Sequence, residues 1–335
     1  MTQKELASRL SIEQGTLSKI ENDQQGVTSQ FLGSLSKELN FPPSFFEQQH
    51  DTFSPRTIYY RRLVQIPKKS LYQAEAQMDI CRWSISKLLR EVEVAGNNMF
   101  KWDVEINGTP EACARYIRQY WQIPKGPIAH LTLFAEKNGV IIIHLEMDDA
   151  ISGFSNVADN GQPIIFLNQK LPADRMRFTL AHEIGHLIMH FIDQPISKDR
   201  DTEKEANAFA AELLAPELEV RHHLVKLDIR RLRELKRFWK ASMHMLLYRA
   251  KTLNTIPEHQ YRALITKLGY EGYRINEPIE FLHEYPVLAK TIIEMHLNQL
   301  GYSREELAST LNMHVEDMET FFNASVPQPR MRIAL

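Results

Sequence analysis

Cysteine is scarce in this chain of 335 residues. Its two cysteines, Cys81 and Cys113, lie far apart in the sequence and show no CxxC spacing. This scarcity excludes a disulfide framework and a cysteine-ligated zinc site. Two isolated cysteines are instead typical of reduced core residues in an intracellular protein.

Long apolar runs, a signal segment and an excess of charge of one sign are also lacking. No apolar run approaches the length of a membrane span, and the first residues show no basic-then-apolar pattern. The formal net charge of −2 gives no general attraction to nucleic acid or acidic membranes, so any nucleic-acid contact must come from a local patch. We therefore expect a cytoplasmic globular protein of two or three domains, with no membrane partner.

The most informative stretch is residues 177–190, RFTLAHEIGHLIMH, in which His-Glu-x-x-His lies inside an apolar helical pattern. Residues four apart share a helix face, so His182 and His186 can direct ring nitrogens at one metal ion. Glu183 beside them can take a proton from a metal-bound water as general base. Histidines hydrogen-bonded in a core are the alternative, but burying these polar groups unsatisfied is costly. The motif therefore indicates a zinc hydrolase.

A third ligand must come from elsewhere in the chain. Catalytic zinc takes three protein ligands and keeps a fourth position open. The extended HExxHxxGxxH scheme is excluded, because Met189 and Ile192 stand where it requires Gly and His. The segment 203–216, EKEANAFAAELLAP, predicts a second helix with two close glutamates, and one of them is the expected ligand.

Helix capping distinguishes these two glutamates as candidate ligands. Thr202 and Glu205 have the Thr-x-x-Glu spacing of a capping box, which would give Glu205 a structural role. Glu203 is therefore the first candidate for the third ligand and Glu205 the second. Asn207 shares the face of Glu203 and could orient a zinc-bound histidine.

Two neighbouring side chains are expected to lie outside the metal site. His190 continues the histidine face one turn beyond the metal, where we expect a supporting or surface role. Glu212 faces away from Glu203, and we expect it to be solvated.

The first fifty residues have helix-turn-helix spacing. Residues 2–10 and 11–22 predict two helices separated by a short break, and the second helix would enter the major groove of DNA. Few lysines and arginines accompany these helices, so a helical interaction module without DNA affinity is the alternative. The candidate DNA contacts are Gln14, Thr16, Ser18 and Lys19.

The residues TQKELASRLSIEQGTLSKIEN, with the downstream LGSLSKELNFPPSFF, resemble the XRE-type helix-turn-helix family. This sequence departs from the family pattern in two ways. The usual first helix is missing, and Ser11 stands at the position of the usual turn glycine. The segments RFTLAHEIGHLIMH and EKEANAFAAELLAP, with ISGFS and IFLN upstream, resemble the ImmA/IrrE metallopeptidases over nearly the whole chain. This resemblance implies Zn²⁺ ligation by His182, His186 and Glu203, catalysis by Glu183, and a repressor-like protein as substrate.

The remaining pattern predicts a small sheet among helices. Apolar runs at 140–145, 151–155 and 163–168 predict three strands, with helices before and after them. The expected fold is mainly α with a small β-sheet, of the α+β class, with a zincin-like metallopeptidase domain. The expected domains are a helix-turn-helix domain at 1–50, a linker and helical region at 51–108, the metallopeptidase at 109–250 and a helical, HTH-like C-terminal domain at 251–335.

Two segments of the C-terminal third carry further patterns. Residues 221–240 form the densest basic run, which predicts a solvated helical face more than a site for DNA or an acidic substrate. Residues 303–313 repeat the pattern of 2–12 at a constant offset of 301, but the acidic segment 314–322 that follows favours an interaction module over a DNA reader.

The leading hypothesis is a zinc-dependent endopeptidase that also binds double-stranded DNA or a DNA-bound partner and acts on a regulatory protein. The alternative is a transcriptional regulator or antitoxin-like module without enzymatic activity, in which the zinc site is latent.

Overall fold

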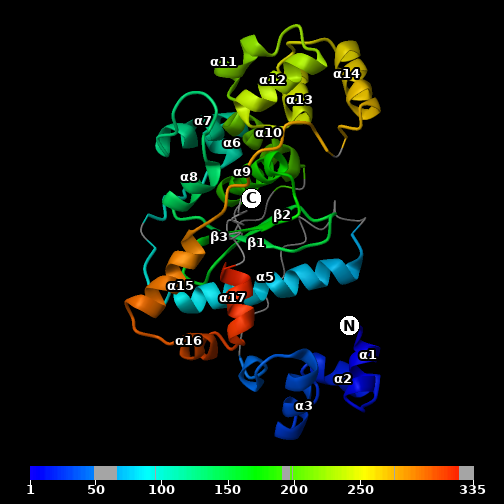
Figure 1. The fold of residues 1–335 in the computed structure, drawn as a ribbon, viewed down its shortest axis with the longest axis vertical. Coiled ribbons are helices and arrows are strands. Elements are labelled where there is room, and N and C mark those ends of the chain that lie inside the picture. The colour runs from blue at the N-terminus through cyan, green and yellow to red at the C-terminus, as the bar shows by residue number, and fades with distance from the viewer. Residues whose placement is uncertain (49–65, 95, 191–196, 198, 275, 324–335) are drawn as a thin grey trace, which may run out of the picture.

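The computed structural model describes all residues except 49–65, 95, 191–196, 198, 275 and 324–335 (Figure 1). The described chain is mainly helical with one small sheet, so the predicted fold class is confirmed. Among the described helices, none is long and apolar enough to cross a membrane.

The sheet consists, among the described residues, of three strands in the order β1-β3-β2. β1 pairs with β3 in parallel, and β2 pairs with β3 antiparallel, so β2 forms one edge. β1 and β3 are buried along their whole length, whereas β2 alternates between buried and half-buried residues. The strands span Ile141–Leu145 (β1), Gly153–Val157 (β2) and Pro163–Asn168 (β3).

Two long helices cover one face of the sheet. α9 (Ala173–Met189) packs on β2 and β3, and α10 (Thr202–Leu214) packs on α9 and on α7 (Pro110–Tyr120). A Cβ atom at Gly185 of α9 would lie 2.9 Å from the Phe209 ring of α10, so a glycine is required for the helices to approach this closely. The short helices α6 (Val104–Asn107) and α8 (Leu131–Lys137) complete this layer.

The opposite face of the sheet is covered by helices from both ends of the chain. α5 carries the buried Met78, Cys81 and Ile85 into the same apolar cluster as Ile141 and Ile143 of β1. Leu307 and Phe322 join this cluster from the C-terminal helices. The helices are α5 (Lys68–Leu88), α15 (Leu288–Asn298), α16 (Arg304–Thr310) and α17 (Val315–Asn323).

A further apolar cluster is formed by the helices that follow α10. Trp239, Leu232 and Leu246 are among its fully buried residues. In Figure 1 these helices lie at the end of the molecule beyond α9 and α10. They are α11 (Glu217–Val220), η2 (Arg221–His223), α12 (Ile229–Trp239), α13 (Met243–Thr252) and α14 (Glu258–Tyr270).

The N-terminal helices lie at the other end of the molecule (Figure 1). Ala7 and Leu17 are their buried apolar residues, and the Lys87 ammonium of α5 contacts Gln48 and the backbone oxygen of Thr310. The elements are α1 (Gln3–Arg9), α2 (Gln14–Glu21), α3 (Ser29–Leu39) and η1 (Pro43–Phe45).

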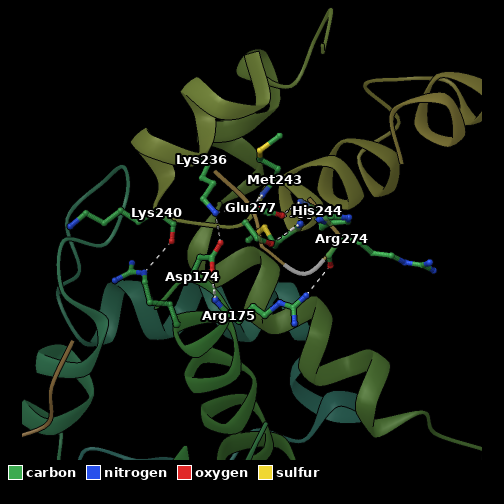
Figure 2. A network of polar contacts seen from close by, with 11 residues as sticks. Asp174, Arg175, Lys236, Lys240, Met243, His244, Arg274 and Glu277 are labelled. Carbon is green, nitrogen blue, oxygen red and sulfur yellow. Dashed lines mark hydrogen bonds and ion pairs between the residues drawn. The ribbon is translucent and has the colours of Figure 1, made fainter. Parts of the chain in front are cut away.

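A buried ionic network fixes α12 and α13 against the start of α9 (Figure 2). The Lys236 ammonium lies 2.6 Å from Asp174 and 2.9 Å from Glu277. Glu277 also accepts hydrogen bonds from the backbone N–H groups of Met243 and His244, at the positive end of α13. Burial raises the pKa of Glu277, but the donors from His244, Met243 and Lys236 outweigh it and lower the pKa to about 2.

We predict that Glu277→Gln lowers the free energy of unfolding at pH 7 by about 2–3 kcal/mol. Glu277 has a lower pKa in the folded chain than in the unfolded chain. Its contribution is therefore complete above about pH 4.5, and it decreases as the pH falls toward 2. The difference between wild type and variant should shrink over that range. Urea denaturation at pH 7 and pH 3, followed by circular dichroism, measures both effects.

Glu280→Gln is the matched control, because Glu280 is exposed on the same segment. This control should change the free energy of unfolding by less than about 0.5 kcal/mol. Equal effects of the two substitutions at pH 7 would contradict a stabilising role of Glu277.

Candidate metal centre

The packing of α9 on α10 brings His182, His186 and Glu203 together, with one ligand atom from each lying within 4.8 Å of the others. The two histidine Nε2 atoms are 2.9 Å apart. The Glu203 carboxylate lies 3.5 Å from Nε2 of His182 and 3.4 Å from Nε2 of His186. His182 and His186 are one helical turn apart on α9, as the sequence spacing predicts.

Hydrogen bonds at the opposite ring nitrogens orient both histidines. Nδ1 of His182 lies 3.1 Å from the Asn207 side-chain oxygen, which can only accept, so Nδ1 carries the proton. Nε2 of a neutral His182 then keeps its lone pair on the Glu203 side. The predicted proximity of Asn207 to a metal-site histidine is thus present in the structure.

His186 is oriented through His190 and Glu205. Nε2 of His190 donates to Glu205 at 2.9 Å, which leaves Nδ1 of a neutral His190 to accept from Nδ1 of His186 at 2.8 Å. Arg200 forms an ion pair with Glu205 at 2.7 Å. Burial lowers the pKa of His186 to about 3, so the ring is neutral and its Nε2 lone pair is available.

This donor set fits a zinc ion. Two neutral imidazoles and one carboxylate are the ligands of many catalytic zinc sites, and each imidazole here has a partner that fixes its tautomer. Burial raises the pKa of Glu203, but its contacts with the His182 and His186 rings outweigh burial and hold the pKa below its ordinary value. The carboxyl group is therefore ionised and suited to a cation.

The predicted capping box of α10 is wrong. The N-cap residue is Asp201, whose side chain accepts from the backbone N–H of Lys204, and Thr202 is the first helical residue. Glu205 pairs with His190 and Arg200 instead of turning back to the helix start. It therefore lies behind the metal-site histidines, and the Glu203 carboxylate is the one that faces them.

Glu183 points toward β2 on the other side of the histidine pair. The side chain is buried, and one carboxylate oxygen, Oε2, accepts a hydrogen bond from Ser155 at 2.7 Å. Burial raises the pKa of Glu183, and the neighbouring His182 ring and the Ser155 hydroxyl oppose this shift only in part. Sequence reasoning did not select Ser155, although it belongs to the ISGFS segment that forms the edge strand.

Comparison with known families agrees with this geometry. Residues 135–251 match the family model described as IrrE N-terminal-like domain, and residues 1–46 match a helix-turn-helix family model. The predicted resemblance to ImmA/IrrE metallopeptidases with an XRE-type module is therefore confirmed over these two segments. A search of curated proteins gave no match.

The segment 135–251 also contains a buried carboxylate that the sequence pattern predicts to be solvated. Glu212 is fully buried and forms ion pairs with Arg249 of α13 and, at 3.2 Å, with Arg115 of α7. It also accepts from the backbone N–H of Glu217. The expectation of a solvated Glu212 is wrong, because its partners come from segments distant in the sequence.

A cleft of about 1210 Å³ opens beside the candidate metal centre. Asn207, which contacts His182, lines it together with Thr179 and Phe178 of α9. The far wall is formed by α13 and α14. None of His182, Glu183, His186 and Glu203 lines the cleft, so Asn207 is the residue through which it adjoins the candidate metal centre.

The candidate DNA-contacting residues lie on α2, far from α9 and α10 (Figure 1). Gln14 and Lys19 are exposed, and Thr16 and Ser18 are half-buried. Gln14 donates to the side-chain oxygen of Gln3 on α1. The structure thus separates these four residues from the metal centre.

We predict that His190→Ala lowers the affinity for Zn²⁺ by about 10–100-fold, because His186 loses the partner that orients its ring. Competition with a chromophoric chelator measures this affinity without any substrate. His259→Ala, an exposed histidine on α14, is the control and should leave the affinity unchanged. Equal affinities for the two variants would show that His190 does not support the metal centre.

Proposed function

We propose that this chain is a zinc-dependent endopeptidase linked to a helix-turn-helix DNA-binding module. The observation that carries the proposal is the convergence of His182, His186 and Glu203 ligand atoms within 4.8 Å. The match of residues 135–251 to the IrrE N-terminal-like domain supports peptidase activity. The match of residues 1–46 to a helix-turn-helix family supports the DNA-binding module.

In this proposal His182, His186 and Glu203 hold the metal, and Glu183 is the general base. A zinc ion bound there supplies Lewis acidity that polarises a peptide carbonyl and acidifies water. Ser155 holds Oε2 of Glu183, which leaves Oε1 to accept a proton from the attacking water and return it to the leaving amine. Burial brings the pKa of Glu183 closer to neutrality and makes it a stronger base than an exposed carboxylate.

The free edge of β2 supports an extended peptide as substrate. Among the described strands, β2 pairs only with β3, and its residues Gly153, Ser155 and Val157 are half-buried. A peptide that adds to this edge by backbone hydrogen bonds passes Ser155, the partner of Glu183. This placement would bring a backbone carbonyl close to the metal ligands.

We infer that the substrate is a regulatory protein of the repressor type, in the cytoplasm. The inference rests on the presence of a helix-turn-helix module in the same chain as the peptidase domain. In this reading Gln14, Thr16, Ser18 and Lys19 bring the peptidase to double-stranded DNA where its substrate is bound.

We predict that Glu183→Gln lowers cleavage by at least about 100-fold while zinc remains bound, because the amide cannot accept the proton. Purified wild-type protein and variant are incubated with proteins encoded by neighbouring genes, and metal-dependent fragments are identified by mass spectrometry. Glu305→Gln, which changes an exposed carboxylate on α16, is the matched control. Cleavage that persists in zinc-loaded Glu183→Gln would exclude Glu183 as the base.

The same experiment separates the peptidase from the alternative of a regulator without enzymatic activity. A wild-type protein that cuts none of these proteins, is insensitive to chelation and still binds a specific duplex would support the regulator.

For the helix-turn-helix module, we predict that Lys19→Ala weakens binding to a DNA duplex that has been selected from a random-sequence pool. The number of counterions released on binding, which is measured from the salt dependence of the affinity, should fall by about one. Gel-shift titrations at several salt concentrations measure both quantities. Lys37→Ala, which removes an exposed lysine from α3, is the control. Equal binding by the two variants would remove Lys19 from the DNA contacts.

A further inference from the structure

Within the described residues, three helix pairs share one turn geometry. In each pair, an α-helix ends one or two residues before a residue in the left-handed conformation, and the second α-helix begins three positions after that residue. The pairs are α1–α2 with Ser11 (φ 55°), α12–α13 with Lys240 (φ 51°) and α16–α17 with Asn312 (φ 56°). All three are helix-turn-helix units by this criterion.

The sequence pattern reveals the first and third units but hides the second. Ala7 and Ala308 occupy the buried position four residues before the turn in the first and third units. Lys236 occupies that position in α12, and it is buried as well. A lysine within a basic run predicts a solvated face, whereas its charge is paired here with Asp174 and Glu277.

The second helix of each unit has different surroundings. α2 is exposed, and α17 packs on β1 and α15 through Met318 and Phe322. α13 instead lines the cleft beside the metal centre, through Met245 and Tyr248 among others.

Met245 and Tyr248 occupy the positions that contact DNA in the recognition helix of a DNA-binding helix-turn-helix unit. Counted from the left-handed turn residue, they lie five and eight positions along, as Thr16 and Lys19 do in α2. In a DNA-binding unit this face enters the major groove. In α13 the same face lines the cleft whose other residues include Asn207, Ala208 and Ala211 of α10.

The cleft between α13 and α10 is lined by apolar side chains and by charged side chains of both signs. Tyr248 is 49% exposed and Met245 is half-buried, so both side chains are accessible. On the α10 wall, Ala208 and Ala211 are small and leave room for a side chain. Charged side chains of both signs also line the cleft, namely Glu111, Asp201, Glu217, Arg115, Arg175, Lys204, Arg221 and Arg249.

The ionic network in Figure 2 holds α13 at a fixed distance from the metal helix. Lys236 of α12 pairs with Asp174 in the first turn of α9, and Glu277 binds both Lys236 and the start of α13. Nδ1 of His244, a cleft-lining residue, lies 2.8 Å from Glu277. A side chain bound at Met245 and Tyr248 therefore has a defined spacing from His182.

We propose that α13 is the substrate-reading helix of the peptidase, and that Met245 and Tyr248 bind a bulky apolar side chain close to the cleaved bond. This inference rests on the proposed function, and its link to the metal centre is Asn207, which lines the cleft and contacts His182. The occupant is an extended protein segment that carries Phe, Leu or Met.

Peptide binding to zinc-loaded Glu183→Gln protein tests the inference separately from cleavage. The probes are two pools of fluorescent nine-residue peptides, alike except at three central positions, which carry Phe, Leu or Met in one pool and Ala, Ser or Thr in the other. We expect about tenfold tighter binding of the bulky pool by anisotropy. Adding Met245→Ala and Tyr248→Ala should reduce this preference to below about threefold, with zinc content and circular dichroism unchanged.

Tyr270→Ala in the same background is the matched control, because Tyr270 lies on α14, is 88% exposed and does not line the cleft. The inference is overturned if the double variant at Met245 and Tyr248 retains the preference for the bulky peptide pool. It is also overturned if Tyr270→Ala loses this preference to the same extent. A fluorescent 20-base-pair duplex is the third probe. If the double variant loses duplex binding and keeps the peptide preference, α13 reads DNA and the inference is wrong.

The outcomes for the two proposals are distinguishable. If wild type cleaves no peptide while the preference depends on Met245 and Tyr248, the proposed peptidase function fails and the reading role of α13 stands. If wild type cleaves both pools through Glu183 and the double variant keeps the same preference, the reading role alone fails.

Discussion

The close contact of α9 with α10 is the constraint on which the metal centre depends. His182 and His186 need only a helix to share a face, but Glu203 reaches them because Gly185 lets the Phe209 ring approach the α9 backbone. The same contact places Asn207 and Glu205 where they orient the two histidines, directly and through His190. A side chain at position 185 would push the helices apart and separate the ligand atoms.

Buried charges connect this centre to the helices around it. Glu212 of α10 binds Arg249 of α13 and Arg115 of α7, and Lys236 of α12 binds Asp174 of α9. Buried ion pairs contribute little net stability, but loss of one partner is costly because it leaves a charge without compensation. These pairs therefore define the position of α13 relative to the metal helix more than they add to the stability of the fold.

The helix-turn-helix geometry occurs in three different settings. The first unit lies apart from the metal centre, the third packs beneath the sheet, and the second forms a wall of the cleft (Figure 1). The turn geometry is local, since it requires one left-handed residue and a buried small or paired side chain. What the second helix faces is set by tertiary packing. A shared motif therefore does not imply a shared ligand.

The sequence by itself determined the features that depend on short spacing. These are the helix with His182, Glu183 and His186, the three strands, and the turn at Ser11, because periodicity and turn chemistry act over a few residues. Tertiary structure alone decided the contacts between distant segments. Ser155 reaches Glu183, Glu205 pairs with His190 instead of capping its helix, and Glu212 and Lys236 are buried. The sequence pattern predicts a charged side chain to be solvated, because its ion-pair partner lies far along the chain. Only tertiary packing brings the two side chains together.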